Sequence, residues 1–275
     1  MKDDTTCQGA SRPSFWLPWG VAVLAVALAC RLVWVLVFQN EIGGDAIRYL
    51  WIAEHVRRGD WHLLPQLFSS PLLPLSLGLL SHFTGDPALA ATWLGVVMNT
   101  LAVGLGMALM RQLFPARPFL ALFTGLGLAL NHVWCRLAPF ALTENLFYPI
   151  LMLFFWLLVR AWHKPSWPLG LALGLSWGLL YLSREIGLYF GAVGFLGWLA
   201  GAWWQQRPKA LAGLSKVAGP ALAVLAMMLT AWLSFYSTSL GIISLGEGHR
   251  FYSTFTQKFD RRSEATYPGY HQGEF

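Results

Sequence analysis

Long apolar runs separated by short polar connections dominate the sequence of this chain. The first run covers residues 17–38. Six further runs follow, at about 88–113, 118–137, 142–162, 168–183, 186–204 and 211–236. A helix that crosses a bilayer needs roughly 20 predominantly apolar residues. The pattern therefore predicts seven transmembrane helices, and prolines such as Pro115, Pro165 and Pro208 stand between the runs, where helix breakers are expected.

The residues between and beyond these runs complete the predicted fold. The apolar stretch 71–83 is too short to cross a bilayer and predicts a re-entrant or interfacial piece within the long first loop, residues 39–87. Polar tails occupy residues 1–16 and 241–275. We therefore expect an all-α polytopic membrane protein whose transmembrane core covers residues 17–240, with interfacial helices in the first loop.

Composition supports this fold class. The chain is 56% hydrophobic and 12% charged, whereas soluble domains are about one quarter charged. The net charge of +6, without a basic run interleaved with aromatic residues, favours anionic lipid surfaces over nucleic acid as neighbours. Cys7, Cys30 and Cys135 are spaced as neither a disulfide framework nor a zinc site, so we expect three free thiols.

The charges of the short loops predict an orientation. One set of loops is basic and contains Arg111, Arg117, Arg160, Lys164, Arg207, Lys209 and Lys216. Most carboxylates fall on the other side, at Glu41, Asp45, Glu54, Asp60, Asp86, Glu144 and Glu185. Basic short loops remain in the cytoplasm. We expect a multi-pass protein of the inner (plasma) membrane, with the N-terminus inside and the first loop and C-terminal tail outside.

Arg31 lies inside the first apolar run. An arginine at such a position either has a function or extends toward an interface. Because it belongs to the later half of the run, we expect its side chain to snorkel toward the interface.

The first candidate site is the helix predicted to begin near Asp45. Asp45, Arg48, Ile52 and His55 have the spacing of one helix face, with Tyr49 and Glu54 beside them. Ile47, Leu50, Trp51 and Ala53 are expected to dip into the lipid headgroups. Asp45 follows two glycines, so it is a candidate N-cap as well as a candidate catalytic acid or base.

Two further candidates lie at the outer ends of later helices. Glu144 precedes a long apolar run, where it is either a complement to the helix dipole or a functional acid. Arg184 is placed to bind a lipid phosphate, or to pair with Glu185 and close the turn. Weaker candidates on the same side are Arg136, His249 and Arg250.

The predicted topology places Asp45, Glu144 and Arg184 on one membrane face, although they are far apart in the sequence. An acid that accepts a proton from a hydroxyl and an arginine that stabilises a departing phosphate suit a reaction on a lipid-phosphate substrate.

These segments occur in an order that resembles the GT-C glycosyltransferases. An N-terminal helix is followed in order by GGDAIRYLWIAEHVRRGDW, SSPLLPLSLGLLSHFTGD, ALTENLF and LGLSWGLLYLSREIGL, and the resemblance covers roughly residues 17–240. The branch that they resemble contains the dolichyl-phosphate-mannose–protein mannosyltransferases and the bacterial aminoarabinose transferases. The resemblance implies a polyprenyl-phosphate-linked sugar donor and a single inverting displacement. It also implies Asp45 as general base, Arg184 near the lipid phosphate and Glu144 in the donor or acceptor pocket.

The sequence also departs from that family. Ala46 stands where members often carry a second acid, and the chain ends soon after the seventh run, where relatives continue. An incomplete enzyme that needs a partner subunit, an inactive membrane scaffold and a lipid or solute transporter are therefore alternatives. We expect no obligatory cofactor; Asp45, Glu54 and Glu144 could hold a divalent metal, but their spacing does not indicate a site. The sequence indicates neither the sugar nor the acceptor.

Overall fold

A computed structural model describes residues 16–37, 45–66, 71–205 and 210–240, and all the regular structure in them is helical. The elements are α1 (Trp16–Val37), α2 (Asp45–Arg57), the 3-10 helix η1 (Trp61–Gln66), α3 (Leu72–Thr84), α4 (Pro87–Leu113), α5 (Pro118–Leu130), α6 (His132–Leu137), α7 (Glu144–His163), α8 (Trp167–Ser183), α9 (Ile186–Gln205) and α10 (Ala210–Leu240). The prediction of an all-α fold is confirmed.

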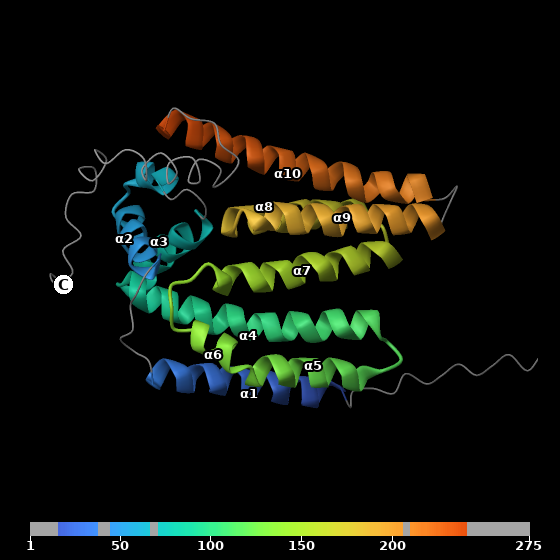
Figure 1. Cartoon of the computed structure of the whole chain (residues 1–275), viewed down its shortest axis with the longest axis horizontal. Coiled ribbons are helices and arrows are strands. Elements are labelled where there is room, and N and C mark those ends of the chain that lie inside the picture. Colours follow the sequence, from blue (N-terminus) through green and yellow to red (C-terminus); the bar gives the residue numbers. More distant parts are fainter. Residues whose placement is uncertain (1–15, 38–44, 67–70, 206–209, 241–275) are drawn as a thin grey trace, which may run out of the picture.

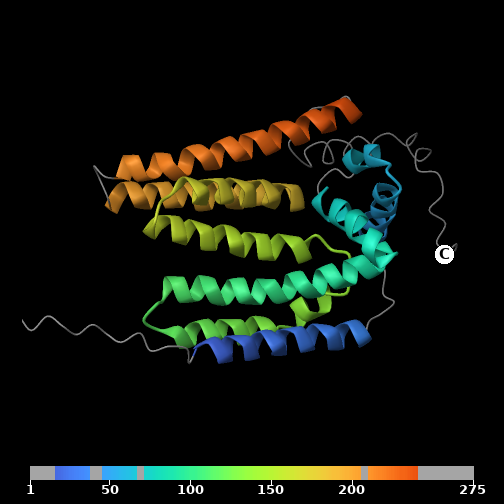
Figure 2. The same cartoon turned by 180° about the vertical axis from the view of Figure 1, so that it is seen from behind.

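The longer helices form a layered antiparallel bundle. Figures 1 and 2 show α1 and α5 on one side, then α4, α7, the pair α8 and α9, and α10 outermost. The helices α2, η1 and α3 lie at the end of this bundle where α7 begins and α8 ends. We call this the α2 end, and we call the opposite end, where α4 and α7 finish, the far end.

Four of the described helices are long and apolar enough to cross a bilayer, which confirms a polytopic membrane protein. They contain Leu17–Val37, Pro87–Leu113, Glu144–His163 and Ser215–Ser239. The other predicted spans correspond to the shorter apolar helices α5, α8 and α9. These helices run beside the long ones, and the count of seven spans stays a prediction.

The predicted span 118–137 is not one helix, because the chain leaves helical geometry at Asn131. This residue has φ −64° and ψ 108°, and its side chain accepts a hydrogen bond from the backbone N–H of Trp134 at 3.1 Å. Asn131 therefore ends α5 and caps α6. Asparagine is a preferred N-cap because its side-chain oxygen satisfies a backbone N–H that lacks a helical partner.

Arg31 of α1 stabilises this break, and the prediction that it snorkels is wrong. Its side chain is fully buried. Nη2 donates to the carbonyl of Leu128 at 3.4 Å, and Nη1 donates to the carbonyls of Ala129 at 3.3 Å and Ala27 at 2.8 Å. The last carbonyls of a helix lack partners and carry partial negative charge. The end of α5 therefore holds the guanidinium inside the bundle.

Small residues allow α8 and α10 to approach closely. Gly170 and Gly174 lie one turn apart on α8, and a Cβ atom built on Gly174 would be 2.3 Å from the carbonyl oxygen of Ala221. Such spacing is typical of membrane helices that pack by van der Waals contact between backbones.

Replacement of Arg31 tests its role at the α5–α6 break. Arg31→Met leaves the carbonyls of Leu128 and Ala129 without their buried donor, so we expect the free energy of unfolding to fall by roughly 1–3 kcal/mol. Thermal unfolding in detergent measures the change. Arg117→Met is the control, because Arg117 is exposed at the far end and its loss should change nothing measurable. Equal stability of Arg31→Met and wild type would contradict this role.

Candidate functional site at the α2 end

The helix α2 begins at Asp45 and is held against α3 by one apolar face. Ala46, Ile52, Ala53 and Val56 are buried. The predicted polar face is therefore interrupted, since Ile52 belongs to the buried side. The placement of Ala53 among lipid headgroups is also wrong, because it is fully buried in the protein, whereas Trp51 is 42% exposed. The buried face of α2 packs mainly on α3, and Ile52 and Val56 also cluster with Leu64 of η1.

Asp45 is exposed at the start of α2, and Arg48 and Tyr49 are half-buried just after it. Tyr49 packs on the main hydrophobic core, which also contains Leu146 of α7 and Leu180 of α8. The first turn of α2 therefore lies over the same core that supports the beginning of α7 and the end of α8.

Glu54, a predicted binding residue, is already engaged within α2. Its carboxylate accepts hydrogen bonds from Arg57 at 2.7 and 2.5 Å and from Arg58 at 2.8 Å. The hydrogen bond from Arg57 is the main cause that lowers the pKa of Glu54 from 4.5 to about 2, and Arg58 adds to it. The next residue, His55, has its Nδ1 atom 3.1 Å from Asp60 Oδ2. These contacts stabilise the end of α2, and they leave Glu54 little capacity for a substrate.

Glu144 and Arg184 form an ion pair that joins two helices. Glu144 is the first residue of α7, and Arg184 directly follows α8. Arg184 Nη1 donates to Glu144 Oε1, and Thr143 Oγ1 donates to Glu144 Oε2 at 3.2 Å. Both charged side chains are partly exposed, at 25% for Glu144 and 41% for Arg184. The guanidinium is therefore held in place while part of it remains accessible.

Two buried asparagines that sequence reasoning missed support this pair. Asn99 Nδ2 donates to Asn145 Oδ1 at 2.8 Å, which links α4 to α7. Asn145 Nδ2 donates to the carbonyls of Leu137 at 3.1 Å and Phe140 at 2.8 Å. The connection that leads into Glu144 is thereby tied to α4. The sequence signal that could have identified these asparagines is a polar residue inside an apolar run, since such residues form hydrogen bonds between membrane helices.

The connection before α7 also depends on a glycine. A Cβ atom built on Gly95 would be 2.0 Å from the carbonyl oxygen of Ala138, and 2.8 Å from Asn145 Nδ2. Only a residue without a side chain lets the backbone at Ala138 lie directly on α4.

The remaining predicted site residues are less closely associated with the pair. Arg136 is exposed on α6, and His249 and Arg250 lie outside the described residues. The helix α2, which begins at Asp45, lies at the end of the bundle where α7 begins with Glu144 and where Arg184 follows α8 (Figure 1). No contact between Asp45 and this pair is resolved among the described side chains.

The described residues do not converge as a metal site. Across residues 16–37, 45–66, 71–205 and 210–240, no three His, Cys, Asp or Glu side chains come together as ligands. Of the acids proposed as ligands, Glu54 is bound by Arg57 and Arg58, and Glu144 is bound by Arg184. These carboxylates therefore do not fit a shared divalent metal.

The ion pairs of Glu54 predict a dependence of stability on pH. Because the pKa of Glu54 is lowered in the folded state, its stabilisation is complete above its ordinary pKa of 4.5 and is lost as the pH falls toward about 2. Wild type should exceed Glu54→Gln in unfolding temperature at neutral pH, and the two should converge near pH 2. A difference that persists unchanged at about pH 2 would contradict this assignment.

Replacement of Gly95 tests the support of the α7 connection. The new methyl group of Gly95→Ala would overlap the Ala138 carbonyl, so we expect a loss of roughly 1–3 kcal/mol in the free energy of unfolding. Gly127→Ala on α5 is the matched control, because a Cβ there meets no atom within 4 Å. That change should be neutral or stabilising by up to about 1 kcal/mol. Equal effects of the two substitutions would exclude a special role for Gly95.

Comparison with known proteins places these features in one family. Residues 69–233 match the dolichyl-phosphate-mannose-protein mannosyltransferase family. The matched segment contains the Asn99–Asn145 link and the Glu144–Arg184 pair, and it begins after α2, so Asp45 lies outside it. No curated protein and no solved structure matches the chain. Because the family match covers more than half of its residues, this chain belongs to the dolichyl-phosphate-mannose-protein mannosyltransferase family.

Proposed function

We propose that this protein is a GT-C glycosyltransferase that moves a sugar from a polyprenyl-phosphate-linked donor to an acceptor outside the cytoplasm. The observation that carries the proposal is the partly exposed Arg184, anchored by Glu144 at the bundle end that also carries Asp45. Family membership supports the transferase class, and the apolar helices support a membrane location. The acceptor class is a lipid, glycan or protein.

Arg184 is the proposed binding group for the donor phosphate. A guanidinium presents planar, paired N–H donors that match phosphate oxygens. One of its nitrogens, Nη1, is held by Glu144, while the side chain stays 41% exposed at the α2 end. As the bond between the sugar and the phosphate breaks, negative charge collects on the lipid phosphate, and Arg184 stabilises that charge.

Asp45 is the proposed general base. The acceptor oxygen forms a bond to the anomeric carbon while the bond from that carbon to the phosphate oxygen breaks. The acceptor hydroxyl proton passes to the Asp45 carboxylate, and the leaving group departs as polyprenyl phosphate. One displacement inverts the anomeric configuration and needs one base, so it needs no second acid at Ala46.

The surrounding polar residues are proposed to complete the substrate site. Arg48 and Tyr49 lie within one turn of Asp45, and they are placed to contact the sugar or the acceptor. Arg136, His249 and Arg250 remain proposed contacts for the lipid phosphate. We further propose an inner-membrane location with the α2 end outside the cytoplasm, and a partner subunit that completes the acceptor site.

Sugar transfer from a radiolabelled polyprenyl-phosphate sugar tests the proposal. Asp45→Asn should lower turnover by roughly 10²–10⁴-fold, the range for loss of a general base. Arg184→Gln should lower it by roughly 10²–10³-fold, because the leaving phosphate loses its cation.

Asp86→Asn is the matched control for these variants. Asp86 is an acid at the same end, and it caps α4 by accepting hydrogen bonds from the backbone N–H groups of Ala88 at 3.2 Å and Leu89 at 3.0 Å. Asparagine caps a helix about as well as aspartate, so turnover should be unchanged. Donor binding without turnover by wild type would indicate that a partner subunit is required. If wild type shows no donor binding and no turnover, the proposal is overturned.

A further inference from the structure

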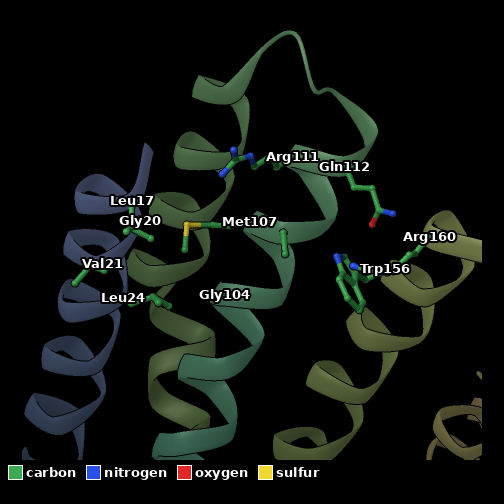
Figure 3. A pocket seen from close by; sticks show the side chains of 11 residues that line it. Leu17, Gly20, Val21, Leu24, Gly104, Met107, Arg111, Gln112, Trp156 and Arg160 are labelled. Atoms are coloured by element: carbon green, nitrogen blue, oxygen red, sulfur yellow. The ribbon is translucent and has the colours of Figure 1, made fainter. Parts of the chain in front are cut away.

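A cavity lies at the far end of the bundle, away from Asp45. It has a volume of about 590 Å³ and lies between α1, α4 and α7 (Figure 3). This volume is within the range of small-molecule sites, which is about 300–1,000 Å³. The proposed transferase mechanism does not use any residue of this cavity.

The polar part of the cavity is formed by the last turns of α4 and α7. Arg111 and Gln112 leave α4 on its two sides, Arg111 toward α1 and Gln112 toward α7, as Figure 3 shows. The guanidinium of Arg160 lies 5.1 Å from the centre of the Trp156 ring. None of the eleven lining residues is acidic. The cavity therefore combines two positive charges without a carboxylate in its wall.

Gln112 adds a hydrogen-bonding group to this positive wall. Its Oε1 atom is buried and has no hydrogen-bond partner among the described residues. A buried acceptor without a donor costs roughly 1–3 kcal/mol, so a ligand that supplies a hydroxyl donor would bind favourably there.

The rest of the cavity is apolar and is formed in part by α1. Its wall includes Leu17, Val21, Leu24 and Met107. Leu17 is 65% exposed and Val21 is 60% exposed, as expected for residues that face lipid. A basic pocket above an apolar wall suits a ligand with an anionic head and acyl chains.

The charge distribution of the described chain favours the same ligand. The far end carries Arg111, Arg117, Arg160, Lys164 and Lys216. The acidic residues of the described part lie at the α2 end, namely Asp45, Glu54, Asp60, Asp86, Glu144 and Glu185. Basic residues at helix C-termini also complement the helix dipoles. Interaction with the helix dipoles does not by itself explain why Arg111 and Arg160 line a cavity together with Gln112 and Trp156.

We propose that this cavity binds an anionic glycerophospholipid of the phosphatidylglycerol class. The positive charges of Arg111 and Arg160 attract the phosphate, Gln112 accepts a hydrogen bond from a headgroup hydroxyl, and the acyl chains lie along α1. Under the predicted orientation, the lipid comes from the cytoplasmic leaflet.

The test is lipid binding to the purified full chain in detergent, measured by native mass spectrometry. The probes are dioleoyl phosphatidylglycerol, phosphatidylethanol (the same charge without a free hydroxyl), phosphatidylcholine and inorganic phosphate. We expect wild type to prefer phosphatidylglycerol to phosphatidylcholine, with about a fivefold contribution from each arginine. This readout does not depend on sugar transfer, so it is separable from failure of the proposed function.

Paired variants make the result decisive. Arg111→Gln combined with Arg160→Gln should abolish the preference, Arg111→Lys combined with Arg160→Lys should retain part of it, and Arg117→Gln should retain all of it. Arg117 is exposed at the same end and does not line the cavity. Equal binding of both lipids by wild type, or an equal loss in Arg117→Gln, would overturn the proposal. Competition by inorganic phosphate at equal concentration would assign the site to a free anion and overturn the lipid.

Gln112→Leu tests the role of the headgroup hydroxyl. It should weaken binding of phosphatidylglycerol and leave binding of phosphatidylethanol unchanged. Equal effects on the two lipids would overturn the role of Gln112. Elution of each variant at the wild-type volume in size-exclusion chromatography serves as the check on folding.

Discussion

Backbone polar groups that leave helical geometry inside a membrane protein must find partners within the protein, and this constraint determines the arrangement of the bundle. The chain interrupts its helices twice in close succession, at Asn131 and between α6 and α7. At the first break, the buried guanidinium of Arg31 from α1 donates hydrogen bonds to the last carbonyls of α5. At the second break, the amide of Asn145 binds two carbonyls of the connection. In both cases a distant helix supplies or supports the donor, so the breaks also hold the layers together.

The candidate site depends on these internal contacts more than on its exposed charges. Asn99 orients Asn145, and Asn145 holds the connection from which α7 starts. The absence of a side chain at Gly95 lets the backbone of that connection lie directly against α4. Glu144 then meets Arg184 across the gap between α7 and α8. A short series of contacts thus joins the centre of the bundle to a partly exposed guanidinium at its end.

Hydropathy alone predicted most of the helices and their order, because each apolar run except 118–137 became one helix within a few residues of its predicted bounds. The predicted spans alternate in direction, which correctly placed Glu144 and Arg184 at the same end of the bundle. Hydropathy could not predict the burial of Arg31, since this depends on a contact between α1 and α5 that the local sequence does not encode. The break at Asn131 interrupts an apolar run, and its local signal is the capping asparagine rather than a change in hydropathy. The face of α2 was misassigned at Ile52 and Ala53 because other helices of the protein bury both residues, and the local sequence does not encode those contacts either.

The partner of Arg184 has a consequence for the order of events in a catalytic cycle of the proposed kind. An arginine that already holds a carboxylate does not wait as a bare charge, so an arriving phosphate must exchange places with Glu144 or share the guanidinium with it. The same carboxylate is available to reclaim the arginine once the sugar has gone. In the proposed cycle, Glu144 would thus compete with the polyprenyl phosphate product for Arg184 and favour release of that product, which would limit inhibition by the product.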